Sequence, residues 1–304
     1  MSAKQKTQSI HVAALGLDHP VLDIHTHALI RKLWKEGPLD HVRHANPDAY
    51  ASADELGRPD FMRWMLAEQG VSHAAILAEE APITSGMIDS VSILKYAAQV
   101  DEFYAFVSLN PFLETSLVGR LDELRSMGTV KGIKLLPPYQ HFAPNDACVY
   151  PLYDRAQELG LPVTFHTGTS RFPGTRLKYA DPLLVDDVAV DFPRLTILLA
   201  HAGRGVWYKE AALLAQLHEN VYLDIAGLPP RNLPAYFPNL SRIAHKLVFG
   251  SDFPGVPSVA DNVRAVVELF GSEQARQILW ETGARILGID EETSASSLQA
   301  RMQR

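Results

Sequence analysis

Eight short apolar segments recur along this 304-residue chain, and their spacing is the feature that most constrains its fold. The segments are Val21–Ile24, His73–Ala78, Tyr104–Leu109, Gly132–Leu136, Pro162–His166, Leu195–Ala200, Val221–Ile225 and Leu247–Gly250. Their first residues lie 52, 31, 28, 30, 33, 26 and 26 positions apart, and one strand followed by one helix needs roughly 30 residues. The spacing therefore predicts eight βα units, which close into a single α/β (β/α)8 TIM barrel.

Amphipathic stretches fill the intervals between these segments and are predicted to be helices. They are Asp54–Gln69, Gly86–Val100, Glu114–Met127, Tyr150–Leu159, Asp181–Val190, Val206–Leu217 and Ser258–Phe270. A doubly wound open sheet is the alternative fold, but no G-x-G-x-x-G motif follows the first strand. We expect an N-terminal extension over 1–19, the barrel over 20–289 and a C-terminal tail over 290–304.

The first interval is longer than the others, and about 20 extra residues lie within 28–53. A connection of this length in a compact domain usually has a function or is disordered. It carries several large polar and aromatic residues, namely Arg31, Trp34, His41, Arg43 and His44. Because it leaves the carboxyl end of the first strand, we expect it to cap the pocket or form its wall. A surface excursion or a dimer contact is the alternative.

Composition narrows the classes of partner. The net charge of −7 disfavours nucleic acid, because binding phosphates requires a basic face. A single cysteine, Cys148, excludes an internal disulfide and suits a reducing cytoplasm. The N-terminal residues "MSAKQKTQSI" have no apolar stretch, so no secretory signal peptide is expected. No apolar run reaches the roughly 18 residues of a membrane span, and no membrane partner is expected.

Metal-ligating residue types follow several of the predicted strands. They are His25 and His27 in "VLDIHTH", His166 in "PVTFHTG", His201 in "ILLAHAG" and Asp252 in "LVFGSDFP". The carboxyl ends of barrel strands converge on one site, so these side chains are predicted to meet there. Residues i and i+2 of a strand share a face, which places both imidazoles of His-Thr-His together. Two neutral imidazoles on one face can chelate Zn²⁺ or a similar divalent ion.

The remaining strand-end residues are given separate roles. His166 completes a set of three protein ligands, which would leave a position open for water. Asp252 is expected to be a ligand, a general base for the bound water, or both. His201 is expected to act as an acid or base beside the metal, although binding a second metal is the alternative. Asp224, within the seventh strand, is interpreted as a buried hydrogen-bonding group rather than a ligand.

Basic and aromatic residues near the same strand ends are candidates for substrate binding. Lys134 ends the fourth strand, and the strand's phase and the adjacent Gly132 point its side chain inward. As an ammonium it could pair with a substrate carboxylate, and as a carbamate it could bridge two metals. Tyr139, Arg171 and Arg204 are candidates for gripping an anionic or aromatic substrate. Arg176 and Trp207 lie in the same region and are candidates as well.

The ordered motifs resemble those of the amidohydrolase superfamily. The strings "DIHTHALI", "GIKLLPPYQHFAPND", "YPLYDRAQELGLPVTFHTGT", "FPRLTILLAHAG", "VYLDIAG" and "VFGSDFP" look like its amidohydrolase 2 branch, which includes aminocarboxymuconate-semialdehyde decarboxylase-like enzymes. The resemblance implies a distorted barrel with one divalent metal, usually zinc, and a homodimer. Carried onto this chain, it makes His25, His27, His166 and Asp252 the ligands and His201 the acid or base.

The branch contains both hydrolases and non-oxidative decarboxylases, so the fold does not choose the reaction. The function expected here is metal-dependent hydrolysis of a small lactone, ester or amide. Decarboxylation of an aromatic or enoic acid on the same site is the first alternative, and a barrel that only binds a ligand is the second. The expected cofactor is one zinc ion, with manganese as the alternative. A second metal held by a carboxylated Lys134 is the less expected arrangement.

Overall fold

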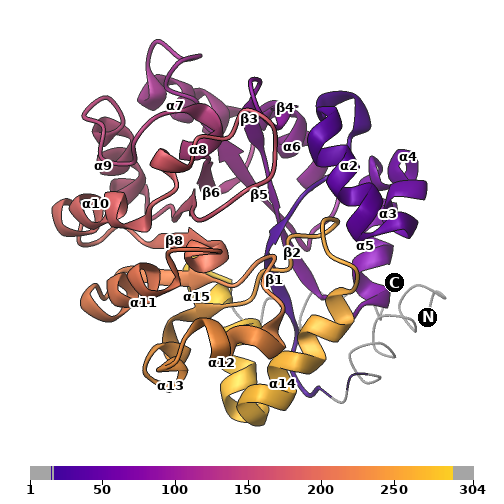
Figure 1. Cartoon of the computed structure of the whole chain (residues 1–304). Coiled ribbons are helices and arrows are strands. Elements are labelled where there is room, and N and C mark those ends of the chain that lie inside the picture. Colours follow the sequence, from indigo (N-terminus) through magenta and orange to yellow (C-terminus); the bar gives the residue numbers. More distant parts are fainter. Residues whose placement is uncertain (1–14, 16, 290–304) are drawn as a thin grey trace.

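The computed structural model describes residues 15 and 17–289, and it contains an eight-stranded parallel sheet (Figure 1). The strands, in the order in which they pair, are β1 (Leu22–Thr26), β2 (His73–Leu77), β5 (Phe103–Ser108), β6 (Val130–Leu135), β7 (Val163–His166), β8 (Ile197–Ala200), β9 (Val221–Asp224) and β10 (Leu247–Val248). Each strand of this sheet pairs with the strand that follows it in this order, as the sequence predicted. The expected tail over 290–304 and most of the extension over 1–19 lie outside the described residues.

Hydrogen bonds between the first strand and the segment after the last strand bring the sheet round into a barrel. Ile24 N donates to Phe249 O at 3.0 Å, and His27 N donates to Phe253 O at 2.8 Å. Asp23 adds a side-chain tie, because its Oδ1 accepts from the backbone N of both His25 and Ser251. The register of β1 against β2 shifts between Asp23 and Thr26, the stretch that contains His25.

Helices surround the sheet and alternate with its strands (Figure 1). They are α2 (Glu36–Ala45), α3 (Pro47–Ala51), α4 (Ala53–Leu56), α5 (Pro59–Glu68), α6 (Ser90–Ala97), α7 (Leu117–Met127), α8 (Pro137–Gln140), α9 (Tyr150–Leu159), α10 (Asp186–Asp191), α11 (Tyr208–Leu217), α12 (Leu233–Tyr236), α13 (Leu240–Ile243), α14 (Val259–Arg276) and α15 (Thr282–Leu287). Within the described part of the chain, no helix has both the length and the apolar character needed to cross a membrane.

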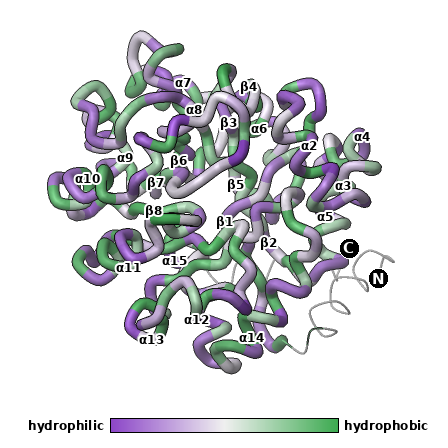
Figure 2. The backbone as a smooth tube through the Cα atoms, in the orientation of Figure 1, coloured by the Kyte–Doolittle hydropathy of each residue, from purple (hydrophilic) through white to green (hydrophobic). Residues whose placement is uncertain are grey.

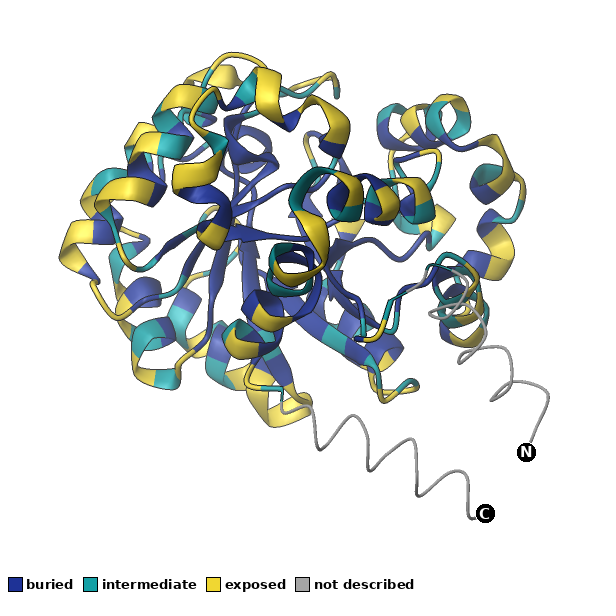
Figure 3. Ribbon diagram, turned by 90° about the horizontal axis from the view of Figure 1, so that it is seen from below, coloured by how far each residue is buried: buried dark blue, intermediate teal, exposed yellow. Residues whose placement is uncertain are grey.

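Burial follows this arrangement. The strands are apolar and buried, whereas the outer faces of the helices are polar and exposed (Figures 2 and 3). The largest apolar cluster packs strand side chains such as Ile76, Val107 and Leu199 against the helices. A second cluster joins strand residues to Trp280 and Leu287 near the C-terminal end of the chain. A barrel built this way buries the apolar surface of both the strands and the helices.

Two of the predicted helices differ most from the structure. The helix expected over 86–100 begins only at Ser90, where the Asp89 side chain accepts from Ser92 N as an N-cap. The residues before it form a hairpin of β3 (Glu79–Ala81) and β4 (Gly86–Ile88). The helix expected over 54–69 is broken, because Pro59 starts a new helix and cannot occupy the interior of one.

The long first connection is not an irregular loop. It folds into a short 3₁₀ turn followed by α2, α3 and the start of α4. Asn46 caps α3 by accepting from Ala49 N, and Pro47 occupies the first helical turn. These helices lie to one side of the barrel, next to the hairpin of β3 and β4 (Figure 1).

Candidate metal centre and active site

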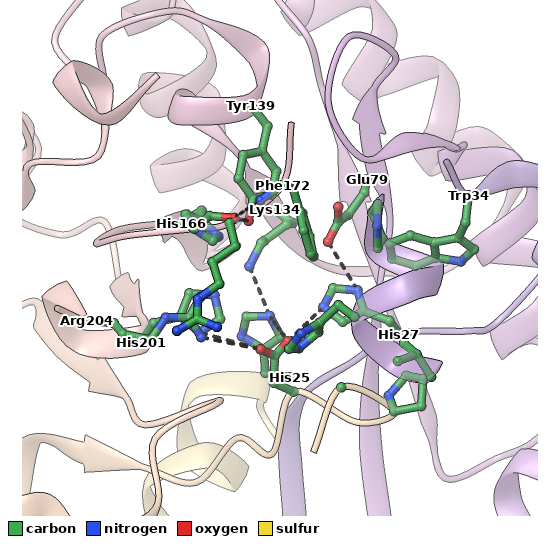
Figure 4. A pocket seen from close by; sticks show the side chains of 18 of the residues that line it. His25, His27, Trp34, Glu79, Lys134, Tyr139, His166, Phe172, His201 and Arg204 are labelled. Carbon is green, nitrogen blue, oxygen red and sulfur yellow. Dashed lines mark hydrogen bonds and ion pairs between the residues drawn. The ribbon is translucent and has the colours of Figure 1, made fainter. Parts of the chain in front are cut away.

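A cavity of about 360 Å³ lies at the carboxyl ends of the barrel strands, a volume typical of small-molecule sites. Its polar lining comes from strands distant in sequence (Figure 4). The titratable lining residues are His25, His27, His41, Glu79, Lys134, Tyr139, His166, Arg171, His201, Arg204 and Asp252. Every residue that the sequence placed at the site by its strand-end position therefore reaches the same cavity.

His25, His27 and Asp252 form a group that could hold a metal ion, because one ligand atom from each lies within 4.8 Å of the others. Asp252 Oδ1 is 3.8 Å from His25 Nε2 and 3.4 Å from His27 Nε2. Two imidazole nitrogens and a carboxylate oxygen are a donor set that suits zinc and other divalent transition metals. The predicted fourth ligand, His166, lies outside this group, and its role as a ligand remains a prediction.

A carboxylate lies behind each imidazole of the first strand. His25 Nδ1 is 2.5 Å from Asp224 Oδ2, and His27 Nδ1 is 3.5 Å from Glu79 Oε1. In metal sites a carboxylate on one ring nitrogen orients the imidazole and directs the lone pair of the other nitrogen to the metal. Burial, aided by the Lys134 charge, lowers the pKa of His25, so this ring is neutral near pH 7. The interpretation of Asp224 as a hydrogen-bonding group is confirmed.

His166 and His201 supply two further buried imidazoles, with ring centroids 4.6 Å apart. Burial lowers the pKa of both well below the usual value, so both rings are neutral. His166 Nε2 is buried and has no hydrogen-bond partner among the described residues. His201 Nδ1 donates to Ala226 O at 2.8 Å, which leaves Nε2 unprotonated. The uncompensated buried nitrogen of His166 fits a site built for a cation or a polar ligand.

Asp252 is the central carboxylate of the cavity. Burial would raise its pKa, but His201, His25 and His27 outweigh burial and hold the pKa well below its usual range. Its backbone has a positive φ of 72°, and His201 has a φ of 64°. Residues other than glycine rarely adopt this conformation, and such strain concentrates at functional sites. The backbone N of Asp252 donates to His25 O at 2.9 Å, which ties the carboxylate to the first strand.

Lys134 points into the cavity, as the phase of its strand predicted. The residue is 1% exposed, and its Nζ lies 3.1 Å from His25 Nε2. Burial lowers the pKa of Lys134 to about 8, and among the charges that oppose this shift Glu79 has the largest effect. Lys134 therefore lies near the carboxylates of Glu79, Asp224 and Asp252, but its hydrogen bond is to the His25 imidazole.

The predicted substrate-binding residues occupy one wall. The Tyr139 hydroxyl donates to Ser170 Oγ at 2.8 Å, and its ring lies 4.5 Å from that of His166. Arg204 donates through Nε and Nη2 to Thr169 O, and its Nη1 is 3.8 Å from Asp252 Oδ2. Arg171 also lines the cavity. Arg176 and Trp207, which the sequence also offered as candidates, are not among its lining residues.

The long first connection forms part of the cavity wall, as expected. Trp34 and His41 line the cavity, and the ring centroids of His41 and Phe172 are 5.9 Å apart. Arg31 and Arg43 do not line it, because both guanidinium groups stack over Tyr50 instead. His44 is an exposed residue. Glycine is needed at position 37, because a Cβ there would lie 2.8 Å from Pro173 Cδ in the loop opposite.

Sequence reasoning missed Glu79 and Phe172. Glu79 directly follows an apolar strand in "AAILAEE", the same signal that identified Asp252. Phe172 carries no such signal, because its position depends on contacts with a helix about 130 residues earlier in the chain.

The sequence model that describes amidohydrolases matches residues 22–289, which is most of the chain. The chain belongs to the amidohydrolase family. This family is generally metal-dependent, and its members are enzymes, in agreement with the donor group of the cavity. The resemblance inferred from the motifs is therefore confirmed at the level of the family. A search of curated proteins found no match to the chain.

Several solved structures share the fold of this amidohydrolase. An uncharacterised TIM-barrel protein from Bordetella bronchiseptica is 19% identical with a TM-score of 0.73, over 89% of this chain and 99% of its own. A probable 2-pyrone-4,6-dicarboxylic acid hydrolase from Acinetobacter baumannii is 15% identical with a TM-score of 0.62, over 89% and 100%. The 5-carboxyvanillate decarboxylase from Sphingomonas paucimobilis is 14% identical with a TM-score of 0.62, over 89% and 99%. At these identities the likeness concerns the fold.

Proposed function

We propose that this amidohydrolase is a metal-dependent hydrolase that opens a small lactone, ester or amide. The observation that carries the proposal is a half-buried carboxylate, Asp252, whose Oδ1 lies 3.8 Å from His25 Nε2 and 3.4 Å from His27 Nε2 in one cavity. His25, His27 and Asp252 would hold the metal, with His166 as a further ligand. When bound, a divalent metal supplies Lewis-acid chemistry that polarises an oxygen of water or substrate, and zinc is the expected ion.

The side chains of the cavity supply the proton transfers. Asp252 accepts a proton from the attacking water as the new C–O bond forms, and an ionised carboxylate is suited to this. His201 Nε2 faces the same space with its ring fixed by Ala226 O, so it relays the proton to the leaving group as the original bond to carbon breaks. The water's hydroxyl thus ends on the acyl carbon and its proton on the leaving group.

The cationic side chains of the cavity favour an anionic substrate. Arg204 and Lys134 lie on the same cavity as the aromatic rings of Trp34, Tyr139 and Phe172. Guanidinium groups bind carboxylates strongly, and flat rings suit a planar substrate. The related fold from A. baumannii is named for a 2-pyrone dicarboxylic acid, which is a planar, anionic lactone. We infer a substrate of this general chemistry.

Decarboxylation of an aromatic acid is the second candidate function. The same cations and rings favour it, and the related fold from S. paucimobilis is named as a decarboxylase. The two reactions differ in products, because hydrolysis consumes water and releases no CO₂. Dihydrocoumarin and 2,6-dihydroxybenzoate, assayed by ring opening and by CO₂ release, would separate them. Ring opening with no CO₂ from the acid is the expected result.

Metal content tests the site itself. We expect elemental mass spectrometry of protein purified without added metal or nickel resin to find about one zinc per chain. His166→Ala should weaken metal binding by at least about 100-fold, because a buried nitrogen is lost from the site. His201→Ala should keep the metal and lose activity. An empty site in His201→Ala would contradict this division of roles, and two metals per chain would indicate a carboxylated Lys134.

Arg204 gives a test of the anionic substrate. We expect Arg204→Met to weaken binding of phthalate, a planar dicarboxylate, by about 10- to 100-fold, since a charged hydrogen bond contributes about 1.5–3 kcal/mol. Titration calorimetry measures the affinity. Arg176→Met is the matched control, because Arg176 is exposed and does not line the cavity. Equal losses in both variants would show that only the overall charge matters.

A further inference from the structure

The contact between Lys134 and His25 conflicts with metal binding at His25. His25 Nδ1 is 2.5 Å from the buried Asp224 carboxylate, so this nitrogen carries the ring proton. His25 Nε2 therefore has one lone pair, and Lys134 Nζ, at 3.1 Å, donates to it. The same lone pair would have to bind a metal. One imidazole nitrogen cannot accept from an ammonium and coordinate a metal at the same time.

Lys134 cannot resolve this conflict by leaving for solvent. The residue is 1% exposed and lies within β6, paired on one side with Ser108 and on the other with Thr164. Among the described residues, the contact with His25 is the one hydrogen bond of Lys134. A buried ammonium that loses it needs another partner nearby, because an unpaired buried charge is very costly. The partner must therefore be another group of the same cavity.

Glu79 is placed to be this partner. The residue is 4% exposed, and its Oε2 is buried without a hydrogen-bond partner among the described residues. The other oxygen, Oε1, lies 3.5 Å from His27 Nδ1, which is a long contact. Glu79 and Lys134 both point into the cavity from neighbouring parts of its wall (Figure 4). A carboxylate with an unused buried oxygen is the acceptor that a displaced ammonium requires.

We propose that Lys134 is a built-in competitor for the metal at His25, and that metal binding transfers its Nζ from His25 Nε2 to Glu79. The inference rests on the proposed function in one respect, that this site binds a divalent metal. It makes Glu79 a positioning residue, which sets metal affinity through Lys134. A carboxylated Lys134 would have the opposite effect, because a carbamate would add a ligand.

A double-mutant cycle tests the exchange. The dissociation constant of Zn²⁺ is measured by competition with a chelating dye for the wild type, Lys134→Met, Glu79→Gln and the double variant. Lys134→Met should bind Zn²⁺ about 10-fold more tightly, because it removes both the competing donor at His25 and a positive charge beside the metal. Glu79→Gln should bind Zn²⁺ about 10-fold less tightly, because it weakens the hydrogen bond that receives Lys134 in the metal-bound state alone. In the Lys134→Met background, Glu79→Gln should have a clearly smaller effect on Zn²⁺ affinity, since only its contact with His27 remains and there is no lysine for Glu79 to receive.

Two further variants serve as controls for the double-mutant cycle. Lys131→Met removes a lysine from the same strand, but its Nζ donates to Leu287 O outside the cavity, so Zn²⁺ affinity should not change. Lys134→Leu repeats the main substitution if Lys134→Met proves unstable in thermal unfolding. A crystal structure of the zinc-loaded wild type should place Lys134 Nζ within hydrogen-bond distance of Glu79.

Each other pattern of Zn²⁺ affinities would overturn one element of the proposal. Unchanged affinity in Lys134→Met would refute the competition, and weaker affinity would refute it in favour of a lysine carbamate ligand. An equal effect of Glu79→Gln in both backgrounds would show that Glu79 acts only through His27. If neither the wild type nor Lys134→Met binds Zn²⁺, the proposed metal-dependent function fails as well. Binding by the wild type without tightening in Lys134→Met overturns this inference alone.

Discussion

Asp252→Asn should lower kcat by about 10³-fold or more, because the amide cannot accept the proton of the attacking water. Asparagine keeps the size of the side chain, so the tie from Asp252 N to His25 O should remain. The loss should appear in kcat even at saturating Zn²⁺. The measurement is steady-state hydrolysis of dihydrocoumarin across a series of zinc concentrations, with bound zinc determined in the same samples.

The zinc series separates the two roles of this carboxylate. If Asp252 were only a ligand, excess Zn²⁺ would restore most of the activity of Asp252→Asn. If it is also the base, the loaded variant stays inactive. Asp261→Asn is the matched control, because Asp261 pairs with Arg264 on an exposed face of α14 and should keep full activity. Activity of loaded Asp252→Asn above about a tenth of the wild type would contradict the base assignment.

The barrel could be predicted because its signal is local and repeated. Each apolar strand is short, each helix is amphipathic, and the interval between strands is nearly constant. The same regularity located the site, since ligand-type residues directly follow apolar strands in a fold whose strand ends converge. His25, His166, His201 and Asp252 came together for this reason, although they are spread over 228 positions, from 25 to 252.

The hairpin of β3 and β4 could not be predicted because its cause is distant in sequence. Gly86 has a φ of +136°, and a Cβ there would lie 2.2 Å from Leu33 O. The glycine therefore reflects the close approach of the 3₁₀ segment near Leu33, to which Trp34 adds a β-bridge. In the sequence the same glycine precedes a helical pattern and was interpreted as its start. Contacts of this kind belong to the packed state and leave no periodic signal.

Glu79 was missed for a related reason. It is followed by a second acid, Glu80, and paired acids after a strand are usually solvent-exposed. Both are buried here: Glu80 Oε1 accepts from the backbone N and the hydroxyl of Ser90, while Glu79 turns into the cavity. Burial of Glu80 depends on the hairpin that sequence analysis did not detect. The missed site residue and the missed hairpin therefore have one origin.

Gly168→Ala should strongly destabilise the protein and disturb the cavity. Gly168 has a φ of +83°, and an added Cβ would lie 2.4 Å from Arg204 N and 2.5 Å from Arg204 O. Both atoms belong to the backbone, so no side-chain rotation can relieve the clash. We expect a loss of about 3 kcal/mol or more in the free energy of unfolding, measured by urea titration.

Gly168→Ala should also impair the active site, because the clash falls on the segment that carries His201 and Arg204. Thr169 N donates to Arg204 O at 2.7 Å, and the Arg204 guanidinium donates back to Thr169 O, so the two loops are fixed to each other. Separating them would move Arg204 and, three residues earlier, His201. Phthalate affinity and kcat should therefore both fall, even where the protein remains folded.

Gly160→Ala is the control that separates the cost of a left-handed backbone from the cost of a steric clash. Gly160 also has a positive φ, of +65°, but a Cβ there would meet nothing within 4 Å. It ends α9 as a left-handed cap, so alanine should cost only about 1–2 kcal/mol through backbone strain and leave activity intact. Equal destabilisation by the two substitutions would mean that the left-handed backbone alone accounts for Gly168. A larger loss at Gly168, with lower phthalate affinity, is expected, because only there do the strand-seven and strand-eight loops pack backbone to backbone.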